Sequence, residues 1–319
     1  MLRRRAGAAV RDLGGETMGT RWSARLVEPA DGMPPGIDAA IGMVLDRIVG
    51  QMSHWEPESD LSRFNRAGID RWCALPPEFV RVLAAALDVA RASDGAFDPA
   101  MGRLADLWGF GPSGLRAVPP HEVEVARLHA AAGPGAVELD APLLRARRRR
   151  DVALDFSGIA KGYAVDAVAH MLYGRGLTDF LVEIGGELYG AGVRPDGQPW
   201  WVDLEAVPGA ETAPVRIALH ELAVATSGDY RRGFTHDGRR YAHTLDSRTG
   251  RPSEAAVASV TVLHPQAMLA DAWATALTVL GPVEGMAAAE REGLAAHMVE
   301  RTGAGGREHW SPAFAAMLG

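Results

Sequence analysis

The chain has 319 residues, of which 47% are hydrophobic, and a formal net charge of −7. This length suits one large or two medium domains with a sizeable core, and the acidic balance disfavours a nucleic-acid partner. An intrachain disulfide is excluded because Cys73 is the only cysteine. No stretch approaches the ~18 apolar residues that a membrane span needs.

The first residues, MLRRRAGAAVRDLGG, have a basic start but lack the apolar run of a signal peptide and a lipidation cysteine. We therefore expect residues 1–15 to be an N-terminal extension and residues 16–319 to form a single domain. The expected location is cytoplasmic. It becomes periplasmic if a misassigned start codon has removed an export signal.

Hydrophobic spacing and turn residues divide the first half of the chain into elements. The predicted elements are a strand at 16–27, a helix at 36–52, a loop with a short helix capped by Ser59 at 53–65, a helix at 77–93, a loop with one or two helical turns at 95–111, a helix at 120–131, and a hairpin of 136–139 with 143–148. A basic cluster at 145–150 is expected to be a solvated strand face.

The second half begins with an apolar run at 152–156, which is typical of the end of a buried strand, and a helical pattern that follows it. Further strands are predicted at 180–184, 187–192, 200–206, 215–219, 222–226, 240–245 and 256–263, helices at 266–280 and 282–292, and then a strand at 295–300, a short strand and a helix from Ser311. Helices and strands come in separate runs, which favours an α+β fold over a doubly wound α/β fold.

The stretch 154–172, LDFSGIAKGYAVDAVAHML, contains Lys161, which is the only lysine of the chain. A strand that passes through a glycine-containing turn into a helix leaves backbone N–H groups that suit a phosphate. A single lysine among arginines indicates a need for a compact ammonium in a tight place. Chance retention of a surface lysine is the alternative, and spacing alone leaves the two about even.

Asp271 and Thr275 lie four residues apart in ADAWATAL, on one face of a predicted helix. Their carboxylate and hydroxyl could offer two hard oxygens to Mg²⁺. Taken alone, the pair is better explained as an ordinary helix start with an acidic residue near its positive end.

His243, in YAHTLDSRTGRP, is placed by the pattern on a strand beside a turn. A histidine can act as a general base near neutrality, although a hydrogen-bonded structural histidine is the more common case. The glycine-rich loops IGGE (184–187) and TSGDY (226–230) allow close backbone approach to a ligand, but they also suit tight turns.

Four large rings fall in predicted loops, where they could stack on a flat heterocycle. For Trp108 and Phe110, plugging a loop onto the core is the favoured explanation. The four rings are Trp55, Phe97, Trp108 and Phe110.

Together these blocks resemble the FAD:protein FMN transferases of the ApbE family. The matching segments follow the family's order between residues 16 and 281. They are ETMGTRW, MSHWEPESDLSRFN, DGAFDPAMGRLADLWGFG, LDFSGIAKGYAVD, LVEIGGELY, ATSGDYRRGF, RYAHTLDSRTGRP and ADAWATALTVLG.

The resemblance implies an α+β, T-fold-related architecture of mixed and antiparallel sheets with packed helices, and an FAD cleft between two halves. It implies an enzyme that uses Mg²⁺ to transfer FMN from FAD to a threonine of an acceptor protein, expected to be a redox subunit, with release of AMP. The flavin nucleotide would be bound by Met18, Trp55, Ala96, Phe97, Asp98, Asp155, Lys161 and Leu245.

By the same resemblance, Asp271, Thr275 and the backbone carbonyl of Gly158 would be the metal ligands. His243 would be the base that accepts the threonine proton, and Lys161 would offset charge on the pyrophosphate.

This chain departs from the family pattern at three points. Ala274 stands where some relatives carry a second metal-ligating aspartate, Ser247 replaces a common proline, and the usual export signal is missing. Two alternatives stay open: an FAD pyrophosphatase that forms FMN and AMP, and a non-catalytic FAD-binding or delivery protein.

Overall fold

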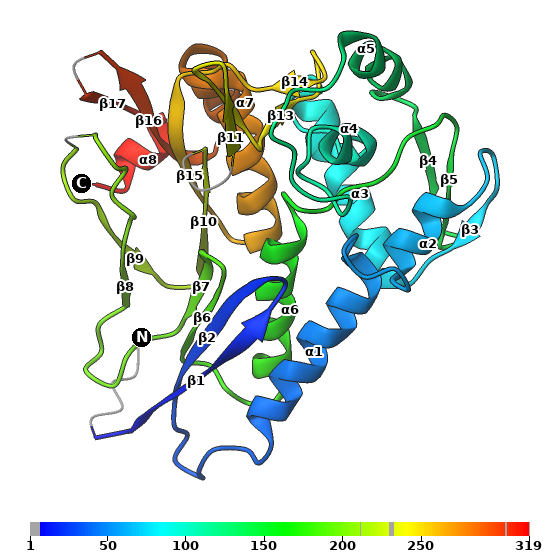
Figure 1. The fold of residues 1–319 in the computed structure, drawn as a ribbon. Helices are drawn as coiled ribbons and strands as arrows, with labels where there is room; N and C mark the ends of the chain where they lie inside the picture. The colour runs from blue at the N-terminus through cyan, green and yellow to red at the C-terminus, as the bar shows by residue number, and fades with distance from the viewer. Residues whose placement is uncertain (1–6, 211, 230–232, 304, 319) are drawn as a thin grey trace.

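The structure, a computed structural model, describes residues 7–210, 212–229, 233–303 and 305–318. Residues 1–6 of the expected extension and Tyr230 of the TSGDY loop therefore lie outside the described residues. Helices and antiparallel strands occupy separate layers, which confirms the predicted α+β class (Figure 1). Within the described ranges, no helix is long and apolar enough to cross a bilayer.

One large sheet forms the frame of the molecule, and every neighbouring pair of its strands is antiparallel. In spatial order its strands are β1 (Val10–Thr17), β2 (Thr20–Val27), β6 (Phe180–Ile184), β7 (Glu187–Ala191), β10 (Leu222–Gly228), β15 (Val257–His264), β16 (Ala295–Thr302) and β17 (Gly305–Trp310).

The prediction of one strand over residues 16–27 is wrong, because these residues belong to a hairpin. Met18 and Gly19 have φ values of 50° and 68°, and they form the two-residue turn between β1 and β2. Such a turn matches the twist of the flanking strands. β1 begins at Val10, so part of the expected N-terminal extension is paired in the sheet.

Two helices that cross the sheet, α6 (Ala160–Gly174) and α7 (Ala267–Arg291), share its main hydrophobic core with α1 (Ile37–Met52). α1 buries residues at spacings of three and four, as its sequence predicted. α7 joins the two predicted helices. Gly281, with φ 75° and ψ −175°, interrupts it just before Pro282.

The opposite face of the sheet carries a smaller core, which includes Trp200, Leu219 and Phe314. It is covered by the hairpin of β8 (Trp200–Asp203) with β9 (Arg216–Leu219), and by α8 (Pro312–Ala316). In Figure 1 these elements lie across the sheet from α6 and α1. The Ser311 hydroxyl accepts the N–H of Phe314 and caps α8.

The remaining elements form the second half of the molecule in space, on the right of Figure 1, although most of them come from residues 60–148. Two short hairpins lie beside this half. The elements of both groups are α2 (Asp60–Arg66), α3 (Pro77–Ala92), α4 (Gly102–Leu107), α5 (Glu122–Ala131), a small sheet of β3 (Cys73–Ala74), β5 (Arg145–Arg148) and β4 (Val137–Asp140), and the pairs β11 (Gly233–His236) with β12 (Arg239–Ala242) and β13 (Leu245–Asp246) with β14 (Arg251–Pro252).

Three local predictions in this half need correction. Residues 152–156 form no strand, and only Ala153 makes an isolated bridge, to Met101. The predicted strand 240–245 breaks after Ala242, so His243 lies in a bend. The basic cluster is not wholly solvated, because Arg148 is buried and donates to the Val152 and Ala67 carbonyls.

Candidate functional site

The site is built around a very close contact between α6 and α7. A Cβ on Gly162 would lie 2.6 Å from the carbonyl carbon of Ala267 and 2.8 Å from the Cα of Met268. Glycine is therefore required for the two backbones to approach this closely. The Gly162 N–H donates to Oδ2 of Asp271 at 3.0 Å, so the contact also fixes that carboxylate.

The start of α7 is held by a side chain of α6. The carboxylate of Asp166 accepts the N–H groups of Ala267 and Met268 at 2.8 and 2.9 Å, and so satisfies two donors at the helix N-terminus. Burial raises the pKa of Asp166 to about 6, although these two hydrogen bonds oppose the rise. No local sequence pattern assigns a role to Asp166.

Lys161, in the first turn of α6, meets two buried carboxylates. Its ammonium forms an ion pair with Glu187 at the start of β7, and it lies 4.0 Å from Oδ1 of Asp271. Burial raises the pKa of both carboxyl groups, while the charge of Lys161 lowers both. Two acids and one ammonium therefore share a poorly solvated space.

Gly158 and Thr275 are brought together beside these charges. A Cβ on Gly158 would lie 3.0 Å from Oγ1 of Thr275 and 3.2 Å from the ring of Phe97, so a side chain would fill this cradle. Asp271 lies one turn before Thr275 on α7. A carboxylate, a hydroxyl and a backbone carbonyl are hard oxygen donors of the kind that Mg²⁺ prefers, and the three residues predicted as its ligands therefore fit such an ion.

Asp155 lies in the segment that leads into α6 and is held by its neighbours. His54 Nδ1 lies 3.2 Å from its carboxylate, and the N–H of Ser157 donates to the same oxygen at 2.8 Å. Burial opposes ionisation, but His54 and Ser157 together lower the pKa of Asp155 to about 2. The neighbouring Trp55 is 52% exposed, so its ring is available for stacking.

The Ala96–Phe97–Asp98 segment is buried at its first two residues and fixed at its third. The carboxylate of Asp98 accepts the N–H groups of Ala100 and Gly133 at 2.8 and 3.0 Å. Burial raises the pKa of Asp98. These hydrogen bonds fix the backbone of the segment, and the Phe97 ring lies close to Gly158.

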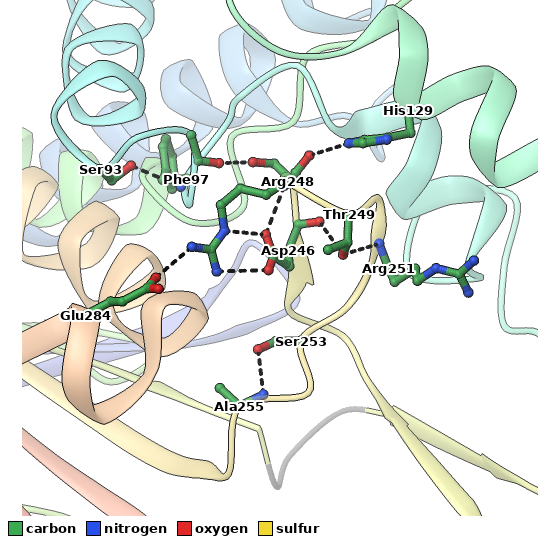
Figure 2. A network of polar contacts seen from close by, with 12 residues as sticks. Ser93, Phe97, His129, Asp246, Arg248, Thr249, Arg251, Ser253, Ala255 and Glu284 are labelled. Carbon is green, nitrogen blue, oxygen red and sulfur yellow. Dashed lines mark hydrogen bonds and ion pairs between the residues drawn. The ribbon is translucent and has the colours of Figure 1, made fainter.

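Polar contacts hold the loop at 246–253 between α7 on one side and α5 on the other, as Figure 2 shows. Arg248 pairs with Asp246 at 3.0 Å and with Glu284 of α7 at 2.8 Å. His129 of α5 hydrogen bonds the Ser247 carbonyl at 2.9 Å. The Ser247 hydroxyl donates to the Gly95 carbonyl, so it connects this loop to the Ala96–Asp98 segment.

His243 and Leu245 flank this loop on its N-terminal side, among aromatic rings. The His243 ring lies edge-on to Phe110, with 6.4 Å between ring centroids. Leu245 packs against the cluster that contains Trp108. The Trp108 indole is buried and donates to the Gly250 carbonyl at 3.0 Å. This ring therefore holds the 246–253 loop against the core, which confirms the structural role favoured for it from the sequence.

Met18 occupies the β1–β2 turn, and the neighbouring Thr20 approaches Gly185 in the IGGE loop. The structure gathers part of the predicted set. Lys161, Asp271, Thr275, Gly158 and Phe97 lie at the α6–α7 contact. His243 and Leu245 lie beside the 246–253 loop, which Ser247 connects to the Ala96–Asp98 segment.

Glu187 is the functional residue that its sequence context conceals most, because it stands at the end of a glycine-rich loop. A signal was present, because Glu187, Tyr189 and Ala191 alternate along a predicted strand. An acidic residue in register with buried positions needs a buried partner, and here that partner is Lys161.

Comparison with known proteins gives a consistent result. A sequence model of the ApbE family matches residues 18–298. A FAD:protein FMN transferase of Vibrio cholerae is 35% identical over 309 residues, which cover 96% of this chain and 92% of that protein. The enzyme of the same name from Escherichia coli K12 is 32% identical over 96% of this chain and 88% of its own.

Solved structures show the same likeness. The apo flavinyl transferase ApbE of Pseudomonas stutzeri matches with a TM-score of 0.91 at 37% identity, over 98% of each chain. The ApbE protein of Thermotoga maritima matches with a TM-score of 0.85 at 31% identity, over 97% of this chain and 99% of that one.

Proposed function

This chain belongs to the ApbE family, and we propose that it is a Mg²⁺-dependent transferase that moves the FMN part of FAD onto a threonine hydroxyl of an acceptor protein. AMP is the other product. The proposed acceptor is a redox protein that presents the threonine. Support comes from relatives named FAD:protein FMN transferase that match nearly the whole chain.

One observation of the structure carries the proposal. Lys161, Asp271, Thr275 and Gly158 converge where α6 and α7 touch, although more than 100 residues separate the first from the second along the chain. An ammonium beside a set of hard oxygens suits a pyrophosphate with its metal ion, because phosphoryl transfer depends on positioning and on charge neutralisation.

Asp271, Thr275 and the Gly158 carbonyl would hold Mg²⁺. A bound Mg²⁺ supplies charge neutralisation on the pyrophosphate and polarises the phosphorus under attack. Lys161 places a further positive charge beside the same group. Asp155 and the Ala96–Asp98 segment would orient the nucleotide, and the exposed Trp55 ring offers a stacking surface.

In the proposed reaction, the threonine oxygen forms a bond to the FMN phosphorus of FAD. The bond from that phosphorus to the bridging oxygen breaks, and its electron pair leaves with AMP. His243 accepts the threonine proton. This assignment is supported by the surroundings of His243: its ring lies edge-on to Phe110, and the 246–253 loop that follows it is fixed by Arg248 and His129.

The test is intact-mass measurement of redox subunits encoded beside the gene for this chain, after incubation with FAD and Mg²⁺. One acceptor should gain the mass of FMN less one water, and the same acceptor with its threonine changed to valine should not. AMP and free FMN formed equally without an acceptor would instead indicate a pyrophosphatase. Tight FAD binding without turnover at any Mg²⁺ concentration would indicate a carrier.

A further inference from the structure

Glu187 is the most deeply buried charged group at the α6–α7 contact. Its side chain is 2% exposed, against 8% for Asp271 and 30% for Lys161. Lys161 is therefore the member of this trio that reaches solvent, and Glu187 lies behind it. A buried carboxylate is costly unless it has a close cationic partner, and Lys161 is that partner.

The two oxygens of Asp271 have different neighbours. Oδ2 accepts the Gly162 N–H at 3.0 Å and is committed to the helix contact. Oδ1 is the oxygen nearest Lys161, at 4.0 Å. An ammonium that moved about 1 Å closer would make a full charge-assisted hydrogen bond to Oδ1, and that bond would compete with a cation for the same oxygen.

We propose that Glu187 is a positioning residue that holds the Lys161 ammonium away from Oδ1 of Asp271 and so leaves that oxygen to the metal ion. The proposal rests on the metal site of the proposed function. It assigns Glu187 a task that neither Lys161 nor Asp271 can perform, because each is attracted to the other.

A purely structural Glu187 would be expected to use both carboxylate oxygens in a network. Here Oε1 pairs with Lys161, and Oε2 accepts no hydrogen bond from any residue that the structure describes. The carboxylate is fixed by its place at the start of β7, directly after the tight Gly185–Gly186 turn. Its strong interaction is thus directed at the lysine.

The experiment measures Mg²⁺ affinity by isothermal titration calorimetry at pH 8 on the full chain with FAD present. The variants are Glu187→Gln, Lys161→Met and the double variant. Glu183→Gln is the matched control, because it makes the same charge change on the neighbouring strand β6, where Glu183 accepts a hydrogen bond from Ser23.

Glu187→Gln should weaken Mg²⁺ binding at least tenfold, since the released ammonium then occupies Oδ1. Lys161→Met should bind Mg²⁺ at least as tightly as the parent, and adding Glu187→Gln to it should cause no further loss. Glu183→Gln should match the parent. Thermal melting of each variant reports whether it has folded.

Two results would overturn the proposal. One is a Mg²⁺ affinity of Glu187→Gln equal to that of the parent. The other is an equal loss of Mg²⁺ affinity when Glu187→Gln is made in the parent and in Lys161→Met, because the effect would then not pass through Lys161. If Glu187→Gln fails to fold, a crystal structure of the parent with Mg²⁺ decides the matter. The Lys161–Glu187 pair must persist there, and Lys161 bonded to Asp271 instead would refute the idea. A parent that binds no Mg²⁺ would refute the metal site itself, which is a distinct outcome.

Discussion

The α6–α7 contact makes Gly162→Ala the most informative single change in this protein. The added Cβ would stand 2.6 Å from the Ala267 carbonyl carbon and 2.8 Å from the Met268 Cα. Non-bonded carbons need about 3.5 Å, so the helices must separate by about 1 Å. The obstructing atoms are backbone, and no rotamer change can relieve the clash.

The free energy of this change can be worked out from two opposing effects. Overpacking costs about 1–3 kcal/mol, and a backbone obstacle places this case near 3 kcal/mol. Alanine regains about 1 kcal/mol of helix propensity relative to glycine. The expected net loss of unfolding free energy is therefore about 2 kcal/mol.

Gly174→Ala is the matched control, because Gly174 ends the same helix and a Cβ there would meet nothing within 4 Å. It should raise stability by about 0.5–1 kcal/mol. Urea unfolding of both variants, followed by circular dichroism, measures the difference. Calorimetry should also show weaker Mg²⁺ binding in Gly162→Ala alone, because Asp271 and Thr275 on α7 then move away from Gly158 beside the start of α6. A Gly162→Ala variant as stable as Gly174→Ala would refute the close contact.

Three further predictions concern the charged groups. Asp271→Ala should abolish Mg²⁺-dependent turnover while FAD binding, followed by flavin fluorescence, falls far less; parent-like turnover would remove the metal assignment. Lys161→Arg should lose most of the transfer rate in the acceptor mass assay although charge is kept, and full activity would refute the need for a compact ammonium. Asp155→Asn tests acid stability. The folded pKa of about 2 lies below the ordinary 3.8, so ionised Asp155 stabilises the fold above pH 3.8, and this contribution is lost as the pH falls through 2. The variant should be about 2 kcal/mol less stable than the parent at pH 6. Urea unfolding should show the difference shrinking towards pH 2, and a pH-independent difference would contradict the assigned pKa.

The helices could be predicted from sequence because their signals are local. The buried positions of α1 recur every three or four residues. α3 begins at Pro77, and Gly95 with φ 78° follows its end. Packing only reinforces what these patterns already favour, so the observed bounds of α1 and α3 lie within one residue of those predicted.

The β1–β2 hairpin escaped prediction because its turn residues carry a weak local signal. Met18 adopts a left-handed conformation that a methionine rarely takes, and the pairing of Thr17 with Thr20 holds it there. The predicted strand at residues 152–156 is wrong for the opposite reason, because its local signal is strong but ambiguous. Val152, Leu154 and Phe156 are buried, the last against Phe79 of α3, and an apolar run does not by itself distinguish a strand from a buried connector.

The sequence predicts single residues of the candidate site, but not the contacts that bring residues of distant segments together. The four-residue spacing of Asp271 and Thr275 is visible along the chain, whereas the approach of Gly158 to Thr275 depends on how α6 and α7 pack. Glu187 comes from a third element, β7, and no local pattern pairs it with Lys161. Contacts between distant segments are what a single sequence conceals.

The pairing of Lys161 also gives a physical reason for a lysine in a chain that otherwise uses arginine. The side chain must fit between Glu187 and Oδ1 of Asp271, both almost fully buried. A guanidinium carries five N–H donors in a rigid plane, and Oδ2 of Asp271 is already occupied by the Gly162 N–H. An arginine could pair with both oxygens of Glu187, but its remaining N–H donors would then lie beside Oδ1 of Asp271 and block the oxygen that the metal needs. A compact ammonium can satisfy Glu187 and still leave the second carboxylate open.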